Sequence, residues 1–299
     1  MPSFDIIIIG GSYAGLSAAM SLGRALRNVL VIDSGTPCNT QTPHSHNFIT
    51  HDGEVPGVIA RKAREQVMRY DTVTFLDDLV TSAQKLDSQF EIATSAGKSF
   101  TARKLLFTTG MKDIMPPIPG FAACWGISVL HCPYCHGYEV RSQPTGIIAQ
   151  GDMAFEISRL IRHWTKDLTL FTNGPSGLSA EQSKRIKAHN IRIVETEIDR
   201  VEHENGYIKE LRLAGGATVA LKAVYARPAL VQHCAIPEAL GCEVNEQNLL
   251  KIDMFQKTTV PGIFAAGDNT TMMRAVSLAV SSGGFAGAAI NKELIEEWF

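Results

Sequence analysis

The chain has 299 residues, a formal net charge of -2, and 45% hydrophobic and 19% charged residues. This length suits about two domains, and the composition is that of a globular chain, not a disordered one. The near-neutral charge, without any block of lysine and arginine, argues against a nucleic-acid-binding surface. The sequence has no run of about 18 apolar residues, so no membrane span is predicted. No secretory signal is expected either, and the predicted location is therefore cytoplasmic.

The N-terminal part of the chain predicts a strand–turn–helix–strand unit. The apolar run 4–9 is typical of a buried parallel strand and ends at Gly10. A helix is expected over 16–26, and a second strand over 29–32 ends in Asp33. Asp33 follows the glycine turn at close to the spacing of about 20 residues that is typical of a ribose-binding acid.

This unit has the properties of a dinucleotide-binding site. Gly10 permits the tight turn, and Gly15 lets the helix pack close to the strand. The free N–H groups at the helix start can bind a pyrophosphate. Ser12 replaces the second glycine of the fingerprint, and its hydroxyl is itself a donor for phosphate. The predicted ligands are Gly10, Ser12, Ala14, Gly15 and Asp33; the alternative is an ordinary βαβ unit without a nucleotide.

Two later segments are expected to return to the same site. The run 105–110 predicts a strand that ends in Thr-Thr-Gly110. Near the C-terminus, residues 258–268 predict a turn and a short strand, followed by Gly267-Asp268 placed to open a helix. Residues 273–294 are rich in small residues and helical in pattern. A buried strand and helix without a ligand are the alternative.

The segment His131-Cys132-Pro133-Tyr-Cys135-His136 carries the reactive chemistry. Two cysteines at this spacing can close a small disulfide. Pro133 suits the first position of a helix, which places Cys132 near a helix N-terminus. A helix N-terminus favours a thiolate, and a thiol of low pKa is both a nucleophile and a good leaving group. These residues predict a redox-active dithiol.

Three other interpretations of this segment remain open. Cys132-x-x-Cys135-His136 also matches the attachment pattern of c-type haem, which normally requires an exported chain. A zinc site would need further ligands, and Cys234 and Cys242 are spaced wrongly for that purpose. The pair could also be two buried structural thiols. The four remaining cysteines are expected to be core thiols: Cys38, Cys124, Cys234 and Cys242.

A second nucleotide-binding unit is expected over residues 145–171, but its glycines are degraded. Ala149 and Gln150 stand where a dinucleotide fingerprint has glycines, while Gly151 remains. An added Cβ hinders the approach of the backbone to a pyrophosphate. No arginine occurs between Arg162 and Arg185 to bind a 2′-phosphate. The central region is therefore predicted to keep the fold and to have weakened or lost nucleotide binding.

Three motifs occur in order around a Cys-x-x-Cys: the first glycine unit, the segment 105–110 and the segment 258–268. This arrangement resembles the low-molecular-weight thioredoxin reductases. The resemblance spans the whole chain. It implies an α/β protein with two Rossmann-like, three-layer ββα domains. The FAD-binding domain is expected to be discontinuous, over 1–113 and 244–299, with the dithiol-bearing region 114–243 inserted. Members of this family are homodimers, so the same is expected here.

The resemblance also assigns residues to roles. FAD would be bound by the first glycine turn together with Gly110, Gly267, Asp268 and Ala275. Cys135 would face the flavin, and Cys132 would exchange with the substrate. His136 stands where the reductases have aspartate, and histidine is the better acid or base near neutral pH. In its Cys-x-x-Cys-His-Gly-Tyr-Glu form the segment resembles small-molecule dithiol oxidases of the gliotoxin and holomycin type.

Three functions fit these residues. The first is an FAD-dependent disulfide reductase whose donor is NADP(H), NAD(H) or a ferredoxin-type carrier. The second is an oxidase that passes electrons from a small dithiol to oxygen. The third is a non-enzymatic flavoprotein redox sensor. For the two enzymes, the partner is expected to be a thioredoxin-like protein or a small-molecule dithiol or disulfide.

Overall fold

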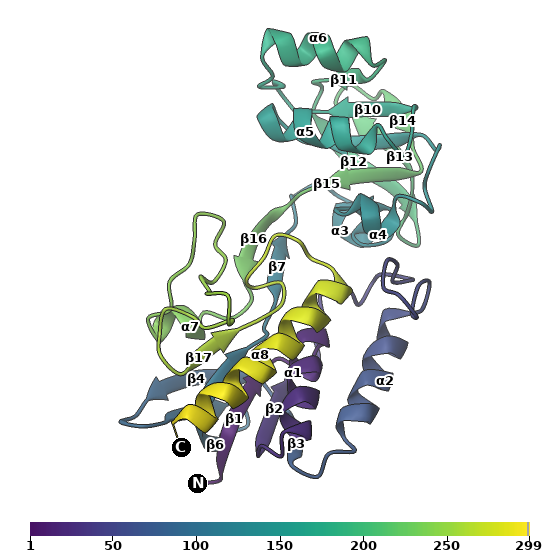
Figure 1. Cartoon of the computed structure of the whole chain (residues 1–299). Helices are drawn as coiled ribbons and strands as arrows, with labels where there is room; N and C mark the ends of the chain where they lie inside the picture. The colour runs from purple at the N-terminus through teal and green to yellow at the C-terminus, as the bar shows by residue number, and fades with distance from the viewer. Residues whose placement is uncertain (298) are drawn as a thin grey trace.

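Two α/β domains are joined by a short two-stranded ribbon (Figure 1). The computed structural model describes residues 1–297 and Phe299. In the ribbon, the outgoing strand β7 (Met111–Ile114) pairs antiparallel with the returning strand β16 (Ala229–Gln232). Within the described residues, no helix is both long and apolar enough to cross a membrane.

The first domain is built on a seven-stranded sheet in which β1 (Ser3–Ile9) is central. Strand β1 is parallel to both of its neighbours, and its run Ile6–Ile9 is buried because layers cover both faces of the sheet. The other strands are β2 (Val29–Asp33), β3 (Val73–Asp77), β4 (Val80–Lys85), β5 (Phe90–Thr94), β6 (Ser99–Phe107) and β17 (Ile263–Ala265).

Helices α1 (Tyr13–Arg24) and α8 (Val276–Glu296) pack together beside this sheet, with α2 (Pro56–Val67) next to α1 (Figure 1). The backbones of α1 and α8 approach closely. A Cβ added to Gly283 would lie 2.0 Å from the carbonyl oxygen of Ala14. Small residues in α8 are therefore required for this contact, which brings the starts of α1 and α8 to one cavity.

The second domain has three layers. Its central five-stranded parallel sheet has α5 (Gly151–Ile161) and α6 (Ala180–Ala188) on one face and a three-stranded antiparallel sheet on the other. This arrangement confirms the predicted α/β class. The parallel strands are β8 (Val129–Leu130), β9 (Thr145–Ile148), β10 (Leu168–Phe171), β11 (Arg192–Val194) and β15 (Ala223–Ala226). The antiparallel strands are β12 (Ile198–Glu204), β13 (Tyr207–Leu213) and β14 (Thr218–Ala220).

Three short helices complete the fold: α3 (Phe121–Cys124), α4 (Pro133–His136) and α7 (Ile236–Ala239). The sequence places the return to the first domain at residue 244, whereas Ile236 and Cys242 already pack in the core of the first sheet. The sequence predicts a helical pattern over 273–294, and helix α8 begins within it at Val276, with Ala275 in extended conformation as its N-cap.

Candidate active site

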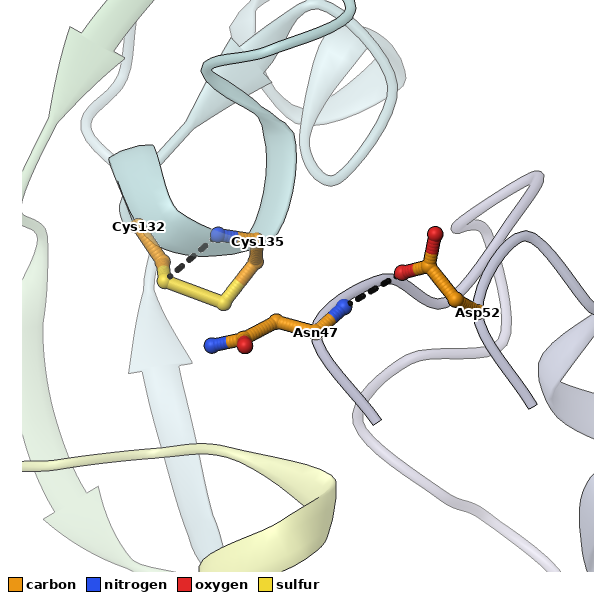
Figure 2. The surroundings of a disulfide bond; sticks show 4 residues. All are labelled: Asn47, Asp52, Cys132 and Cys135. Carbon is orange, nitrogen blue, oxygen red and sulfur yellow. Dashed lines mark hydrogen bonds between the residues drawn. A yellow bond between two sulfur atoms is a disulfide. The ribbon is translucent and has the colours of Figure 1, made fainter. Parts of the chain in front are cut away.

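Cys132 and Cys135 form a disulfide at the start of α4, with their Cα atoms 5.3 Å apart (Figure 2). Pro133 occupies the first helical position and Cys132 is the N-cap, as the sequence predicts. The Cys135 N–H donates a hydrogen bond to the Cys132 Sγ at 3.1 Å. In the reduced pair this donor would favour a thiolate at Cys132 over one at Cys135.

One cavity between the two domains brings together most of the predicted site residues. The second domain contributes Cys135 and His136 to its lining. Cys132 and Gly15 do not line it, so Cys135 is the member of the pair on the cavity side. From the first domain, the predicted residues that line it are Gly10, Ser12, Ala14, Asp33, Gly110, Gly267, Asp268 and Ala275.

The first-domain wall of this cavity fits a dinucleotide such as FAD. A Cβ on Gly10 would lie 2.4 Å from the carbonyl oxygen of Thr108, and one on Gly15 would lie 2.0 Å from that of Gly10. Neither Ser12 nor Ala275, the N-caps of α1 and α8, makes a side-chain capping hydrogen bond. Two helix starts therefore offer backbone N–H groups, which suit a pyrophosphate and electron-rich ring atoms.

A buried ion-pair cluster at the ribbon was not predicted. Arg274 bonds Asp113 of β7 through two nitrogens, at 2.7 and 3.1 Å, and its Nε lies 3.3 Å from Asp268. The three side chains are 9%, 7% and 18% exposed. Burial raises the pKa of Asp268, and Arg274 partly offsets this effect. Arg274 was recognisable in the sequence as the single charged residue between Asp268 and Lys292.

A loop of the first domain reaches the disulfide of the second. Two backbone hydrogen bonds of 2.8 Å close this loop: the Ser45 N–H donates to the Glu54 carbonyl oxygen, and the Gly53 N–H donates to that of Ser45. Asn47 adopts a left-handed conformation at φ 59°, and its N–H donates to Asp52 at 2.8 Å. Figure 2 shows Asn47 between Asp52 and the disulfide. The sequence analysis missed this loop, although its polar run His44-Ser-His-Asn47 could have indicated it.

Histidines dominate the acid–base chemistry of the cavity. The Nε2 of His46 lies 3.7 Å from Glu139 Oε1, so this pair links the two domains. Burial and the neighbouring His46 lower the pKa of His136. A neutral imidazole next to Cys135 is able to accept a proton at neutral pH.

Cys38 differs from its expected place in the core. Cys124 and Cys242 are buried, but Cys38 is exposed and lines the cavity beside Asn39 and Arg274. It lies in the loop after β2, which follows the cavity wall and does not pack under the sheet. No group of three or more histidine, cysteine, aspartate or glutamate side chains in the described part of the chain could hold a metal ion.

The pH dependence of stability should report on His131. Burial and the nearby Arg274 guanidinium lower its pKa from 6.5 to about 4. Between these values the unfolded chain binds a proton that the folded chain does not, so stability should fall as the pH is lowered through this window. We expect the melting temperature of the wild type to fall more between pH 7 and pH 4.5 than that of His131→Asn. Parallel curves for the two proteins would contradict this assignment.

At the start of α5, where the sequence predicts a second nucleotide-binding unit, several groups make hydrogen bonds within the protein. The Gly151 N–H at the start of α5 donates to the carbonyl oxygen of Ser176 at 2.8 Å. The side chain of Gln150 donates to Thr172 O at 2.7 Å, and that of Gln182 donates to Asp152 at 2.8 Å. The first N–H group of α5 and two side chains beside it are thus bonded within the protein.

A glycine-rich dinucleotide cavity that faces a Cys-x-x-Cys disulfide on a second α/β domain defines a flavin-dependent disulfide oxidoreductase. The chain belongs to the pyridine nucleotide-disulphide oxidoreductase family, whose model matches residues 4–283. Membership in this family implies FAD as the cofactor and confirms the thioredoxin reductase-like class.

Individual relatives agree with this assignment. The chain is 33% identical over 305 residues to thioredoxin reductase aclD of Aspergillus oryzae, covering 98% of this chain and 97% of the relative. Among solved structures, a putative thioredoxin reductase TrxB from Bacillus anthracis has a TM-score of 0.95 at 31% identity, over 99% and 100% of the two chains. An oxidoreductase from Agrobacterium tumefaciens has a TM-score of 0.93 at 38% identity, over 99% of each chain.

Proposed function

We propose that this enzyme exchanges electrons between bound FAD and the Cys132–Cys135 pair, and between that pair and a dithiol or disulfide substrate. The observation that carries the proposal is the position of the pair. Cys135 lines the cavity that the glycine turn and both uncapped helix starts also line, whereas Cys132 does not. Cys135 is then the thiol on the flavin side, and Cys132 is the thiol that exchanges with the substrate.

The exchange at the protein thiols follows from the hydrogen bond at the N-cap. In substrate reduction, the Cys132 thiolate attacks a substrate disulfide and displaces one substrate thiolate. Cys135 then attacks the Cys132 sulfur, which closes the 132–135 disulfide and releases the second substrate thiolate. Oxidation of a dithiol reverses these steps. His136 accepts or returns the proton of Cys135, and FAD, when bound, supplies the two-electron exchange.

The FAD-binding residues are proposed on the same basis. Gly10, Ser12 and Ala14 would present backbone N–H groups to the pyrophosphate, and Asp33 would bond a ribose. Gly110, Gly267, Asp268 and Ala275 would contact the rest of the cofactor. Because Arg274 already bonds one Asp268 oxygen, the other is the one available to FAD.

We infer that neither NADP(H) nor NAD(H) is the physiological donor. The hydrogen bond that occupies the Gly151 N–H at the start of α5 and the absence of an arginine between 162 and 185 support this inference. The electron source is then a substrate dithiol or a ferredoxin-type carrier. If the source is a dithiol, oxygen is the electron acceptor to test. A thioredoxin-like protein or a small-molecule dithiol or disulfide remains the proposed partner, and a cytoplasmic homodimer remains a prediction.

Anaerobic bleaching of the flavin tests this proposal. The purified FAD-loaded protein is mixed with NADPH, NADH or dithiothreitol, and its absorbance near 450 nm (about the flavin maximum) is followed. We expect bleaching by the dithiol and not by either nucleotide, because the Gly151 N–H is already bonded within the chain and no arginine is placed to bind a 2′-phosphate. Rapid bleaching by a nucleotide would contradict the inference about the donor and leave the dithiol chemistry in place.

Admitting oxygen then distinguishes a dithiol oxidase from a disulfide reductase. If the protein is a dithiol oxidase, admitting oxygen after bleaching by dithiothreitol should restore the colour and release hydrogen peroxide through repeated cycles. If it is a reductase with another donor, recovery should be slow and should accelerate with a disulfide substrate. Absence of bleaching by any dithiol would contradict both enzymes and favour the redox sensor.

A further inference from the structure

The side chain of Asn47 lies at the interdomain cavity with its amide unbonded. Asn47 lines this cavity together with Cys135 and His136, whereas Cys132 does not. Figure 2 shows the Asn47 side chain directed toward the disulfide. The backbone N–H of Asn47 donates to Asp52, but its side-chain amide makes no hydrogen bond with the described residues. Two N–H donors and one carbonyl acceptor are therefore available in the cavity.

Contacts on both sides hold Asn47 in place. Its left-handed backbone, at φ 59°, is stabilised by the 2.8 Å hydrogen bond from its N–H to Asp52 Oδ1. The same Asp52 oxygen lies 3.5 Å from His46 Nδ1, and His46 Nε2 lies 3.7 Å from Glu139 of the second domain. The loop is thus tied to the segment that follows α4. A donor on a fixed backbone needs little reorganisation when charge develops beside it.

A left-handed backbone does not by itself distinguish Asn47, because asparagine tolerates this conformation in ordinary turns. Five asparagines in the described part of the chain have positive φ: Asn47, Asn173, Asn190, Asn205 and Asn248. Of these five, Asn47 alone lines the interdomain cavity. Its place beside the reactive pair, and not its turn geometry, indicates a role in the chemistry.

The two sulfur atoms of the pair differ in their hydrogen-bond donors. The Sγ of Cys132 accepts from the Cys135 N–H at 3.1 Å. No group among residues 1–297 and Phe299 donates a hydrogen bond to the Sγ of Cys135. Burial and the neighbouring His46 lower the pKa of His136, so its imidazole is neutral near pH 7 and carries no extra proton to give. A thiolate that forms at Cys135 therefore needs another donor from the cavity.

We propose that the Nδ2–H group of Asn47 donates a hydrogen bond to the Cys135 thiolate during thiol–disulfide exchange. This role rests on the proposed dithiol exchange. When a substrate thiolate attacks the Cys132 sulfur, the bond between the two cysteines breaks and its electron pair passes to Cys135. The second substrate thiolate then attacks the first substrate sulfur and releases Cys132, so the substrate is oxidised to its disulfide and the pair is reduced.

The hydrogen bond acts on the sulfur that leaves in the first of these steps. The Cys135 anion forms on the cavity wall that Asn47 shares, and a charge-assisted bond from the amide lowers its free energy. Asn47 should thereby lower the pKa of the Cys135 thiol and make this sulfur the better leaving group.

Alkylation of Cys135 tests the proposal in the FAD-loaded Cys132→Ser variant, in which Cys135 lacks its disulfide partner. Iodoacetamide is added across a range of pH, and mass spectrometry of the Cys135 peptide gives the rate at each pH. We expect Asn47→Gly in this background to raise the pKa of Cys135 by about 1, since a hydrogen bond to a charged group is lost. With both cysteines present, Asn47→Gly should slow bleaching by dithiothreitol severalfold.

Glycine adopts positive φ without strain, so the loop should persist in Asn47→Gly, and FAD content and melting temperature verify this. Asn47→Asp is the second variant. It keeps the size and the backbone conformation but replaces the donor with a carboxylate, so it should raise the pKa of Cys135 more than Asn47→Gly does. If Asn47→Gly loses FAD, Asn47→Asp carries the test.

The matched control is Asn190→Gly, which makes the same change at φ 58° in the exposed turn after α6. It should leave the pKa of Cys135 and the bleaching rate unchanged. An unaltered Cys135 pKa in both Asn47 variants would overturn the proposal while leaving the dithiol exchange in place. Absence of bleaching of the wild type by any dithiol would instead reject the exchange itself, and the role of Asn47 with it.

Discussion

Replacing Cys135 with serine is expected to abolish turnover with every dithiol or disulfide substrate, a loss of roughly a thousandfold or more. Serine has nearly the size of cysteine, but it cannot form a disulfide and its hydroxyl does not ionise near neutral pH. Cys132 in this variant can still form a mixed disulfide with a substrate, yet no second thiol remains to release it. Steady-state turnover and anaerobic bleaching by dithiothreitol measure the effect.

Cys242→Ser is the matched control for this substitution. Cys242 is buried and is distant from the Cys132–Cys135 pair in the sequence. Its Sγ bonds Thr258 Oγ1 at 3.4 Å, a contact that a serine hydroxyl can keep. Its variant should retain full turnover and FAD. Unchanged activity in Cys135→Ser would reject the dithiol mechanism, and mass spectrometry of trapped mixed disulfides would show whether Cys132 still reacts.

Replacing Arg274 with methionine should lower the free energy of unfolding by about 3–5 kcal/mol, because it leaves two buried carboxylates without their cation. Asp113 and Asp268 are 7% and 18% exposed, so water compensates them poorly. Methionine keeps much of the packing volume, which confines the change to the charge. Denaturant unfolding of the wild type and variant, both loaded with FAD, measures the difference.

Two further variants distinguish a charge effect from a packing effect. Adding Asp113→Asn to Arg274→Met removes one unpaired carboxylate and should restore part of the loss, which packing alone would not do. Arg61→Met breaks an exposed pair with Glu65 and should change the stability by less than about 0.5 kcal/mol. A loss below about 1 kcal/mol in Arg274→Met would show that the cluster is not a main support of the ribbon.

The sequence by itself determined the features that depend on neighbouring residues. The apolar run Ile6–Ile9 specifies a buried strand, and Gly10 specifies its exit. Both follow from the residues themselves, because apolar side chains favour burial and glycine readily adopts positive φ. Pro133 between two closely spaced cysteines placed Cys132 at a helix N-cap for the same reason. The α/β class followed from the order of such segments.

Only the tertiary structure decided which distant groups meet. Arg274 joins Asp113 across the ribbon, and the loop that carries Asn47 reaches the disulfide, although long stretches of chain separate the partners. At the start of α5, the Gly151 N–H bonds the Ser176 carbonyl oxygen. Backbone groups are the same in nearly every residue, so no side-chain pattern predicts such a bond, and it forms only where the folded chain brings donor and acceptor together.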